Sequence, residues 1–166
     1  MSPALRRPEP IVDSHDVSGF DCGNPTLNDW LRERALDNER RGATRTFVAA
    51  RGRRVVGYYS LAVSAVHRRE ATGRVRRNMP EPIPAMLLAR LAVDRTAQSE
   101  GLGRHLLRDA MLRTLDAAEI AGIRILLVHA INESAKEWYR QFDFEESPTD
   151  PLQLMLLLAD LRHELG

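Results

Sequence analysis

Hydrophobic positions along the chain follow two periods, one typical of strands and one typical of helices. The runs TRTFVAA and RRVVGYYSLAVSAV are rich in β-branched and aromatic residues and flank a short turn at residues 51–54, which predicts a hairpin. AMLLARLAVD and RILLVHAI are almost continuously apolar, as expected of strands that are buried on both faces. FEES and LQLMLLLAD predict two closing strands on either side of a turn at residues 147–151.

Three other segments repeat apolar residues at helical spacing. The first begins at Pro25, after a candidate asparagine cap, and ends near Gly42. The second runs from Gly103 to Ala121 and stops at a glycine, and the third is NESAKEWYRQF. The order of these strands and helices predicts one α/β domain over residues 1–166, with a mixed central sheet and helices on both of its faces.

Arginine is concentrated in one segment of a nearly neutral chain. The formal net charge is +1, yet residues 40–77 hold 11 arginines and a single acid, Glu70. The stretch HRREATGRVRRNMPEPIP, which begins inside this segment, carries a glycine and three prolines, so we expect a loop there. The clustering predicts an anion-binding surface, because a guanidinium matches a phosphate with two parallel hydrogen bonds.

Composition excludes several classes of protein. With 43% hydrophobic and 28% charged residues the chain is typical of a globular protein, and its apolar runs are too short to cross a bilayer, so we expect no membrane partner. The first arginines are not followed by an apolar segment, so we expect no secretion signal. The single cysteine fits a reducing, cytoplasmic location, and the five histidines lack partners at metal-ligand spacing, so we expect no metal site.

A glycine-containing loop, QSEGLG, follows the strand AMLLARLAVD and precedes the second helix. Gly101 and Gly103 allow a ligand to approach the backbone, and unpaired N–H groups at a helix start attract negative charge. The loop therefore predicts a pyrophosphate site, to which Arg104 would add a contact. The chain has no GxxxxGK[ST] string, and Leu106 occupies the third glycine position of GxGxxG, so Q/R-x-x-G-x-G/A is the pattern that fits.

A second motif lies on the third predicted helix. Asn132, Ala135 and Tyr139 form the pattern N-x-x-A-x-x-x-Y, and FDF opens the strand that follows. Together with QSEGLG, this motif resembles the GCN5-related N-acetyltransferase (GNAT) family over nearly the whole chain. The resemblance implies a GNAT-like mixed sheet flanked by helices, and acetyl-CoA as the acyl donor.

The same resemblance assigns roles to individual residues. It implies that the pyrophosphate of acetyl-CoA binds the loop, that Asn132 binds the pantetheine arm, and that Tyr139 is the catalytic residue that protonates the leaving thiolate. Backbone groups at the end of the preceding strand would hold the pantetheine and polarise the thioester. The implied acetyl-CoA-binding residues are Leu91, Ala92, Val93, Gln98, Ser99, Glu100, Gly101, Leu102, Gly103, Arg104 and Asn132.

Several longer strings resemble one branch of that family, the TacT-type toxins of bacterial toxin–antitoxin pairs. They include FDCGNPTLNDWL, GATRTFVAA, RRNMP and LARLAVD. This resemblance implies acetylation of the α-amino group of aminoacyl-tRNA, a block of translation, neutralisation by a ribbon-helix-helix antitoxin, and a homodimer. One departure concerns the loop, where Ser99 and Glu100 replace the more usual Gly-Lys. A carboxylate beside a pyrophosphate should weaken binding unless Glu100 points to solvent.

Acetyl transfer requires a neutral amine, and no glutamate in the central strands is placed to act as the base. Asp94 lies at the edge of the loop, where a turn or helix-entry role is the alternative. An α-amine with a pKa near ~7.7 is partly neutral at physiological pH, whereas a lysine with a pKa near ~10.4 is almost fully charged. The sequence therefore favours an α-amine as the acceptor, with a water molecule carrying the proton away.

The basic segment fits tRNA, because contacts to phosphates give affinity without reading sequence. The alternative use of the same arginines is to dock an acidic antitoxin tail. Two other functions stay open, which are acetylation of a small-molecule amine or protein N-terminus, and a catalytically inactive acyl-CoA sensor. The predicted tRNA-binding residues are Arg45, Arg68, Arg69, Arg74, Arg76, Arg77 and Arg90.

Overall fold

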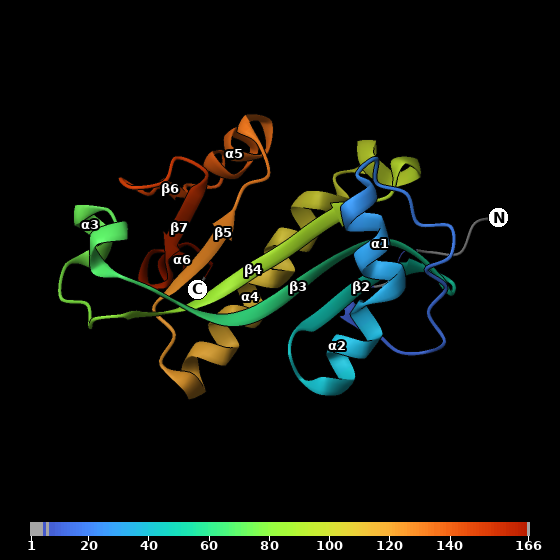
Figure 1. The fold of residues 1–166 in the computed structure, drawn as a ribbon, viewed down its shortest axis with the longest axis horizontal. Helices are drawn as coiled ribbons and strands as arrows, with labels where there is room; N and C mark the ends of the chain where they lie inside the picture. The colour runs from blue at the N-terminus through green and yellow to red at the C-terminus, as the bar shows by residue number, and fades with distance from the viewer. Residues whose placement is uncertain (1–4, 6, 166) are drawn as a thin grey trace. The chain divides into compact units, whose positions relative to one another are not determined.

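Seven strands hydrogen-bond in the order β1-β2-β3-β4-β5-β7-β6 within the residues that the computed structural model describes, which are 5 and 7–165 (Figure 1). β4 and β5 run parallel, whereas β2 pairs antiparallel with β1 and β3, and β7 pairs antiparallel with β5 and β6. The sheet is therefore mixed, as the sequence predicts. The strands are β1 (Glu9–Pro10), β2 (Arg45–Arg51), β3 (Arg54–Val66), β4 (Ile83–Val93), β5 (Ile125–His129), β6 (Glu145–Glu146) and β7 (Gln153–Leu157).

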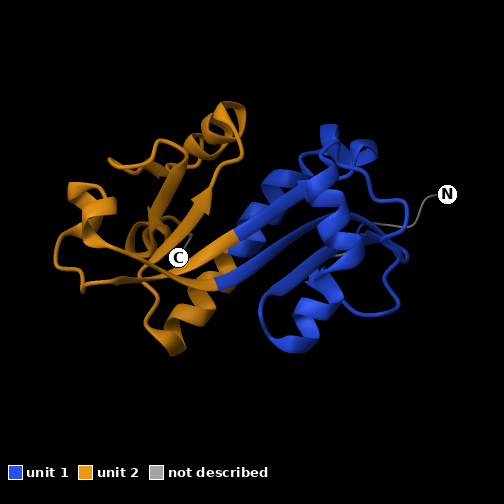
Figure 2. Cartoon of the chain, viewed as in Figure 1, with its two compact units in different colours: residues 1–62, 89–110 blue, residues 63–88, 111–166 orange. Residues whose placement is uncertain are grey.

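The chain divides into two compact units. The first contains residues 1–62 and 89–110, and the second contains residues 63–88 and 111–166 (Figure 2). β3, β4 and helix α4 (Leu102–Ala121) contribute residues to both units. That the whole chain forms a single domain stays a prediction. None of the helices in the described part of the chain is long and apolar enough to span a membrane.

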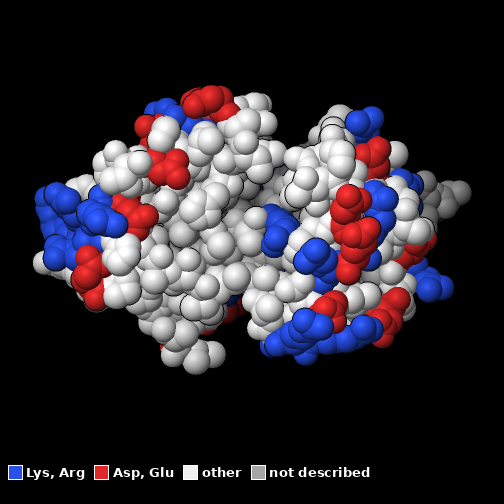
Figure 3. All heavy atoms as spheres, in the orientation of Figure 1, with Lys and Arg blue, Asp and Glu red and all other residues white. Residues whose placement is uncertain are grey.

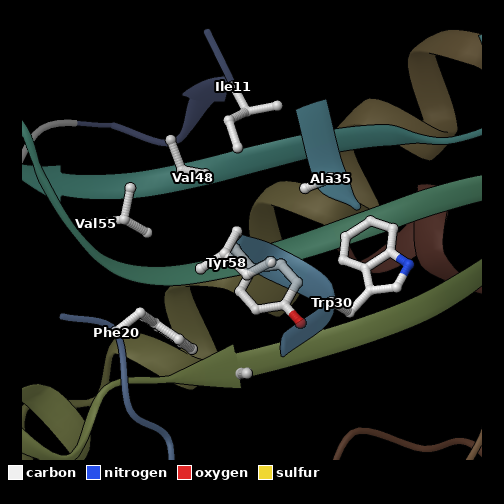
Figure 4. Close-up of a cluster of buried hydrophobic side chains, with 9 residues drawn as sticks. Ile11, Phe20, Trp30, Ala35, Val48, Val55 and Tyr58 are labelled. Atoms are coloured by element: carbon white, nitrogen blue, oxygen red, sulfur yellow. The ribbon is translucent and has the colours of Figure 1, made fainter. Parts of the chain in front are cut away.

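In the first unit, helices cover both faces of the sheet. Consecutive residues of a strand point to opposite faces, and two tyrosines of β3 follow this rule. The Tyr58 hydroxyl donates to a backbone carbonyl of α1 (Pro25–Glu33) at 2.7 Å, whereas the Tyr59 hydroxyl donates to a carboxylate of α4 at 2.5 Å. Phe20 packs edge-on against Tyr58, and Trp30 stacks on it (Figure 4). The predicted placement of helices on both faces is confirmed in this unit.

The first predicted helix is in fact two helices. α1 ends just before Arg34, which leaves the helical conformation (φ −123°, ψ −26°), and α2 (Ala35–Arg41) follows. Gly42 ends α2 with a φ of +74°, a conformation that favours glycine. The break allows α2 to pack along β2, where a carboxylate oxygen of Glu39 accepts from the N–H of Thr46 (3.0 Å).

The core of the second unit includes a short helix that the sequence pattern missed. The 3₁₀ helix η1 (Arg68–Glu70) and α3 (Gly73–Arg76) lie within the segment predicted to be a loop. Thr72 caps α3 by accepting from the N–H of Val75 (3.2 Å), and the Val75 side chain is fully buried. One buried residue in a single helical turn produces no repeat in the sequence, so the pattern alone predicted a loop there.

The C-terminal part of the second unit also differs from the expectation. α5 (Glu133–Arg140) lies where it was predicted, but β7 runs directly into a further helix, α6 (Leu158–Leu165). The N–H of Leu158 still donates to Arg124 O (3.1 Å), and Leu158 and Leu161 are buried at helical spacing. Apolar residues continue from the strand into the helix, and this continuity hides the boundary in the sequence.

Candidate active site

In the first unit, the loop QSEGLG has the backbone geometry of an anion site. It forms part of the 3₁₀ helix η2 (Arg95–Glu100), passes through Gly101 with a φ of +75°, and enters α4 at Leu102. The first backbone bond at this end of α4 joins the His105 N–H to Gly101 O (3.3 Å). The N–H groups of Leu102 and Gly103 lie in the first turn of α4, before the first of these bonds, and therefore have no acceptor within the helix. A side chain at Gly101 would meet no atom within 4 Å, which leaves its backbone open to a ligand.

In the segments on either side of the loop, several side chains are buried, so mainly the backbone is available to contact the acyl donor, acetyl-CoA. The Ala92 side chain, near the end of β4, is buried in the cluster that contains Trp30 and Tyr58. Leu102 is buried against β3, where a Cβ at Gly57 would lie only 3.1 Å from its Cδ2 atom. Any contact that Ala92 or Leu102 makes with acetyl-CoA would thus come from its backbone.

Gln98 holds the loop to the end of β4. Its side-chain amide nitrogen donates to Val93 O (2.9 Å) and to Cys22 O (3.1 Å). Both N–H groups of that amide are thereby committed to backbone carbonyls. The contribution of Gln98 to an anion site would therefore be to hold the loop in shape.

Asp94 is buried at the start of the loop and ties it to a distant turn. Its carboxylate accepts from the Thr96 N–H (2.9 Å), the Thr96 hydroxyl (2.7 Å) and the Asp21 N–H (2.9 Å). Burial acts to raise the pKa of Asp94, but the hydrogen bonds from Thr96 and Asp21 outweigh it, and the pKa is lowered. Asp94 is therefore ionised at neutral pH with its oxygens occupied, which suits the helix-entry role better than that of a general base.

Asp94→Asn is expected to lower the free energy of unfolding by about 1–3 kcal/mol at pH 7, because the amide would turn an N–H toward a buried backbone donor. Denaturant unfolding measures this difference. A carboxylate with a lowered pKa contributes stability above its unfolded-state pKa, and the contribution is lost as the pH falls through the folded-state pKa. The difference between the two proteins should therefore shrink below about pH 4. A difference that stays constant from pH 7 to pH 3 would contradict this role.

Glu100 is paired rather than pointing freely to solvent. Its carboxylate contacts the guanidinium of Arg51, the last residue of β2. Its neighbour Ser99 is exposed, and so is Arg104 in the first turn of α4. The carboxylate of Glu100, which departs from the family pattern, is thus paired with a cation from β2.

In the second unit, the structure brings Asn132 and Tyr139 together on α5. Asn132 is the N-cap of this helix, and its side-chain oxygen accepts from the Ala135 N–H (2.8 Å). The cap directs the amide nitrogen of Asn132 away from the helix backbone, where it can donate to a ligand. The two residues lie seven positions apart, which places them on the same side of the helix about two turns from each other.

The Tyr139 side chain is buried among aromatic rings, at 5.5 Å from Phe144 and 5.0 Å from Trp138 between ring centroids. Its hydroxyl has no hydrogen-bond partner among residues 5 and 7–165. Burial raises the pKa of Tyr139 well above its ordinary value, so the phenol keeps its proton at neutral pH. A protonated hydroxyl without an internal acceptor is suited to donate a proton to a leaving group.

Sequence reasoning missed Lys136, which lies on the same helix. Its ammonium pairs with Glu146 of β6 and lies 3.7 Å from Glu133, and its side chain is largely buried. Lys136 thereby ties the helix that carries Tyr139 to the closing hairpin. The available signal was composition, because Lys136 is the only lysine in the chain.

Four of the predicted tRNA-binding arginines of the second unit lie on η1 and α3, where basic side chains gather at the left of Figure 3, and the fifth, Arg77, directly follows α3. Arg74 differs from the rest, because it pairs with Glu145 (3.3 Å) and Asp160 (2.5 Å) and joins α3 to β6 and α6. For the other four guanidinium groups, no carboxylate of the described residues lies within ion-pair distance. These four are Arg68, Arg69, Arg76 and Arg77.

The two remaining predicted arginines belong to the first unit. Arg45 begins β2 and pairs with Glu39 (3.6 Å). The guanidinium of Arg90, on β4, lies 4.0 Å from the centroid of the Trp30 ring, and burial together with the nearby Arg34 lowers its pKa. In the described part of the chain, neither Arg34 nor Arg90 has a carboxylate partner. A half-buried guanidinium beside a second cation is a favourable position for an external anion.

The chain is similar in sequence to known acetyltransferases. The acetyltransferase (GNAT) domain family matches residues 42–146. A curated protein of Mycobacterium tuberculosis (strain ATCC 25618 / H37Rv), named tRNA-acetylating toxin, is 54% identical to this chain over 159 residues. The matched region covers 96% of this chain and 96% of that protein.

Solved structures of similar proteins include two complexes of the toxin AtaT. AtaT complexed with acetyl-methionyl-tRNAfMet superposes with a TM-score of 0.91 at 28% identity, over 98% of this chain and 100% of that chain. A mutant of AtaT bound to acetyl-CoA and to the C-terminus of the antitoxin AtaR superposes with a TM-score of 0.83 at 27% identity, over 98% of each chain. Among the described residues, no group of three or more His, Cys, Asp or Glu could hold a metal ion.

Proposed function

Because this chain belongs to the GNAT family of acetyltransferases, we propose that it is a toxin that uses acetyl-CoA to acetylate the α-amino group of an aminoacyl-tRNA and thereby blocks translation. The observation that carries the proposal is the similarity to a tRNA-acetylating toxin over nearly the full length of both chains. The likeness to AtaT in its complex with acetyl-methionyl-tRNAfMet supports the same acceptor class.

The residues of both motifs fit acetyl-CoA, which would supply the acetyl group as a thioester. The open backbone at Gly101 and the free helical N–H groups of Leu102 and Gly103 suit its pyrophosphate. The amide nitrogen of Asn132 would donate to the pantetheine arm, while Asn132 Oδ1 continues to cap α5. Backbone groups at residues 91–93 would hold the thioester carbonyl.

Tyr139 would act as the general acid. When the amine nitrogen bonds to the acetyl carbon and the carbon–sulfur bond breaks, the departing sulfur needs a proton, and the Tyr139 hydroxyl supplies it. The proton lost by the amine passes to water and restores the phenol, so the overall reaction leaves the enzyme unchanged. The raised pKa of Tyr139 keeps the donor form populated at neutral pH.

The occupied carboxylate of Asp94 supports an acceptor that needs no strong base. An α-amine with a pKa near ~7.7 is already partly neutral at physiological pH, unlike a lysine side chain. The ester-linked amino acid of a charged tRNA presents such an amine. This agrees with the location we propose, the cytoplasm, where charged tRNA is found.

The test of this function is direct. Purified protein is incubated with radiolabelled acetyl-CoA and a mixture of charged tRNAs, and the acetylated amino acid is identified after hydrolysis of the ester. We expect label on the α-amine of one or a few aminoacyl-tRNAs and little label on free amino acids or peptides. Label on small amines or protein N-termini alone would overturn the tRNA assignment and leave the acetyltransferase assignment intact.

We further propose that the arginines within residues 68–77 bind tRNA phosphates, together with Arg45 and Arg90. The strongest of these are the four whose guanidinium groups have no carboxylate partner in the described part of the chain, Arg68, Arg69, Arg76 and Arg77. The partner proteins would be an antitoxin, of the ribbon-helix-helix type, and a second copy of the chain. The antitoxin-bound structure of AtaT supports an antitoxin as a partner. The same basic surface would also suit an acidic segment of the antitoxin.

Changing Arg76 and Arg77 to Ala is expected to weaken tRNA binding and to reduce the slope of log K against log salt by about 0.7–0.9 for each lost phosphate contact. Filter binding with charged tRNA at several salt concentrations measures both quantities. The matched control changes Arg40 and Arg41 to Ala, which removes the same charge from another adjacent pair whose members already contact Asp13 and Asp37. Equal effects of the two double variants would show that net charge alone, and not this surface, determines binding.

A further inference from the structure

Glu100 is an acidic group in the loop where the proposed ligand, acetyl-CoA, would place the negative charge of its pyrophosphate. It stands directly before Gly101, within the loop whose backbone suits a pyrophosphate. Like charges a few ångströms apart repel strongly unless water or a counterion screens them. A receptive loop therefore requires that the charge of Glu100 be neutralised.

The structure supplies the counterion from a different part of the chain. The Arg51 guanidinium contacts Glu100, although the two residues are 49 positions apart in the sequence. The Arg51 side chain is only 27% exposed, compared with 45% for Glu100, so the pair is partly shielded from solvent. The positive charge of the guanidinium compensates the negative charge of Glu100.

The same turn also contacts the residues that lead into the loop. Arg54 is the cross-strand neighbour of Arg51 in the hairpin, and its Nη2 lies 3.4 Å from Thr96 Oγ1 and 3.5 Å from Asp94 Oδ1. The hairpin therefore contacts the residues that lead into the loop, through Arg54, and the loop itself, through Arg51. These two contacts fix the position of Arg51 relative to Glu100.

We propose that Arg51 is a positioning residue for the acyl donor, which neutralises Glu100 and thereby makes the loop receptive to the pyrophosphate of acetyl-CoA. The proposal rests on the proposed function, because it takes the loop as the donor site. Arg51 acts through Glu100 and does not itself need to touch the ligand. The consequence is that the requirement for Arg51 disappears when Glu100 loses its charge.

A double-mutant cycle measured by calorimetry with acetyl-CoA tests this dependence. Arg51→Ala should weaken binding about tenfold at low salt, which corresponds to about 1.4 kcal/mol. Glu100→Gln should bind as tightly as the parent or more tightly, and the double variant should match Glu100→Gln within about twofold. The matched control is Arg53→Ala, which removes the same charge from the same turn. Arg53 donates to Ser14 O (2.9 Å) and not to the loop, so this variant reports the effect of the lost charge alone.

A donor without phosphates separates this role from a merely structural one. Turnover of S-acetyl-pantetheine should fall no further in Arg51→Ala than in the control Arg53→Ala, whereas KM for acetyl-CoA should rise in Arg51→Ala and not in the control. A double variant as weak as Arg51→Ala, or an equal loss with both donors, would overturn the proposal. If the parent itself does not bind acetyl-CoA, the proposed function fails first. If the parent binds and Arg51→Ala binds equally well, the role of Arg51 alone is refuted.

Discussion

Tyr139→Phe is expected to lower kcat for acetyl transfer by about 10²–10⁴-fold, the usual contribution of a general acid. The affinity for acetyl-CoA should change little, because the ring and its contacts with Trp138 and Phe144 remain. The hydroxyl has no partner among the described residues, so its removal leaves no internal group unpaired. Single-turnover kinetics with charged tRNA, together with calorimetry for the donor, measures the two effects separately.

Tyr59→Phe is the matched control for this variant. It also removes one buried hydroxyl, but that hydroxyl donates to Asp109 (2.5 Å). Its loss should lower the free energy of unfolding by about 1–3 kcal/mol and leave kcat unchanged. For the parent, kcat should not fall between pH 7 and pH 9, because burial raises the pKa of Tyr139 and the acid form persists. Full turnover by Tyr139→Phe would show that Tyr139 serves only in packing.

Gly103→Glu is expected to abolish acetyl-CoA binding. The new carboxylate would stand in the first turn of α4, where the free N–H groups suit a pyrophosphate. Two unit charges about 4 Å apart repel by about 4 kcal/mol at an effective dielectric constant near 20, which corresponds to about a 10³-fold loss of affinity. Calorimetric titration with acetyl-CoA measures the loss, and circular dichroism checks that the fold is retained.

Gly19→Glu is the control for this second prediction. Gly19 also belongs to the first unit, is exposed, and has open space around the position of a Cβ. The same charge is thereby added to the same unit at a position outside the loop, and acetyl-CoA binding should stay within about twofold of the parent. Unchanged affinity in Gly103→Glu would remove the pyrophosphate from this loop, whatever the control does.

Features set by neighbouring residues could be predicted from the sequence alone. The hairpin, the buried strands and the long helix follow from apolar periodicity, and the end of the loop follows from Gly101, whose φ of +75° few other residues adopt. The Asn132 cap and the spacing to Tyr139 lie within a single helix, so the pattern that identified them contains their geometry. The local geometry of both motifs was predictable for this reason, and the chemical roles of their residues stay a prediction.

Tertiary structure alone decided which charges and hydrogen bonds belong together. Arg74, predicted to bind tRNA, is joined to Glu145 and Asp160, which lie more than 70 positions further along the chain. Asp94 is bound to the backbone of a turn 73 positions away, and this partner removes it as a candidate base. Periodicity reports only which face of an element is buried, whereas an ion pair depends on how distant strands and helices are brought together by the fold. For that reason the sequence alone indicated that Glu100 is unfavourable for binding a pyrophosphate. Its pairing with Arg51 could be identified only from the tertiary structure, in which the end of β2 contacts the loop.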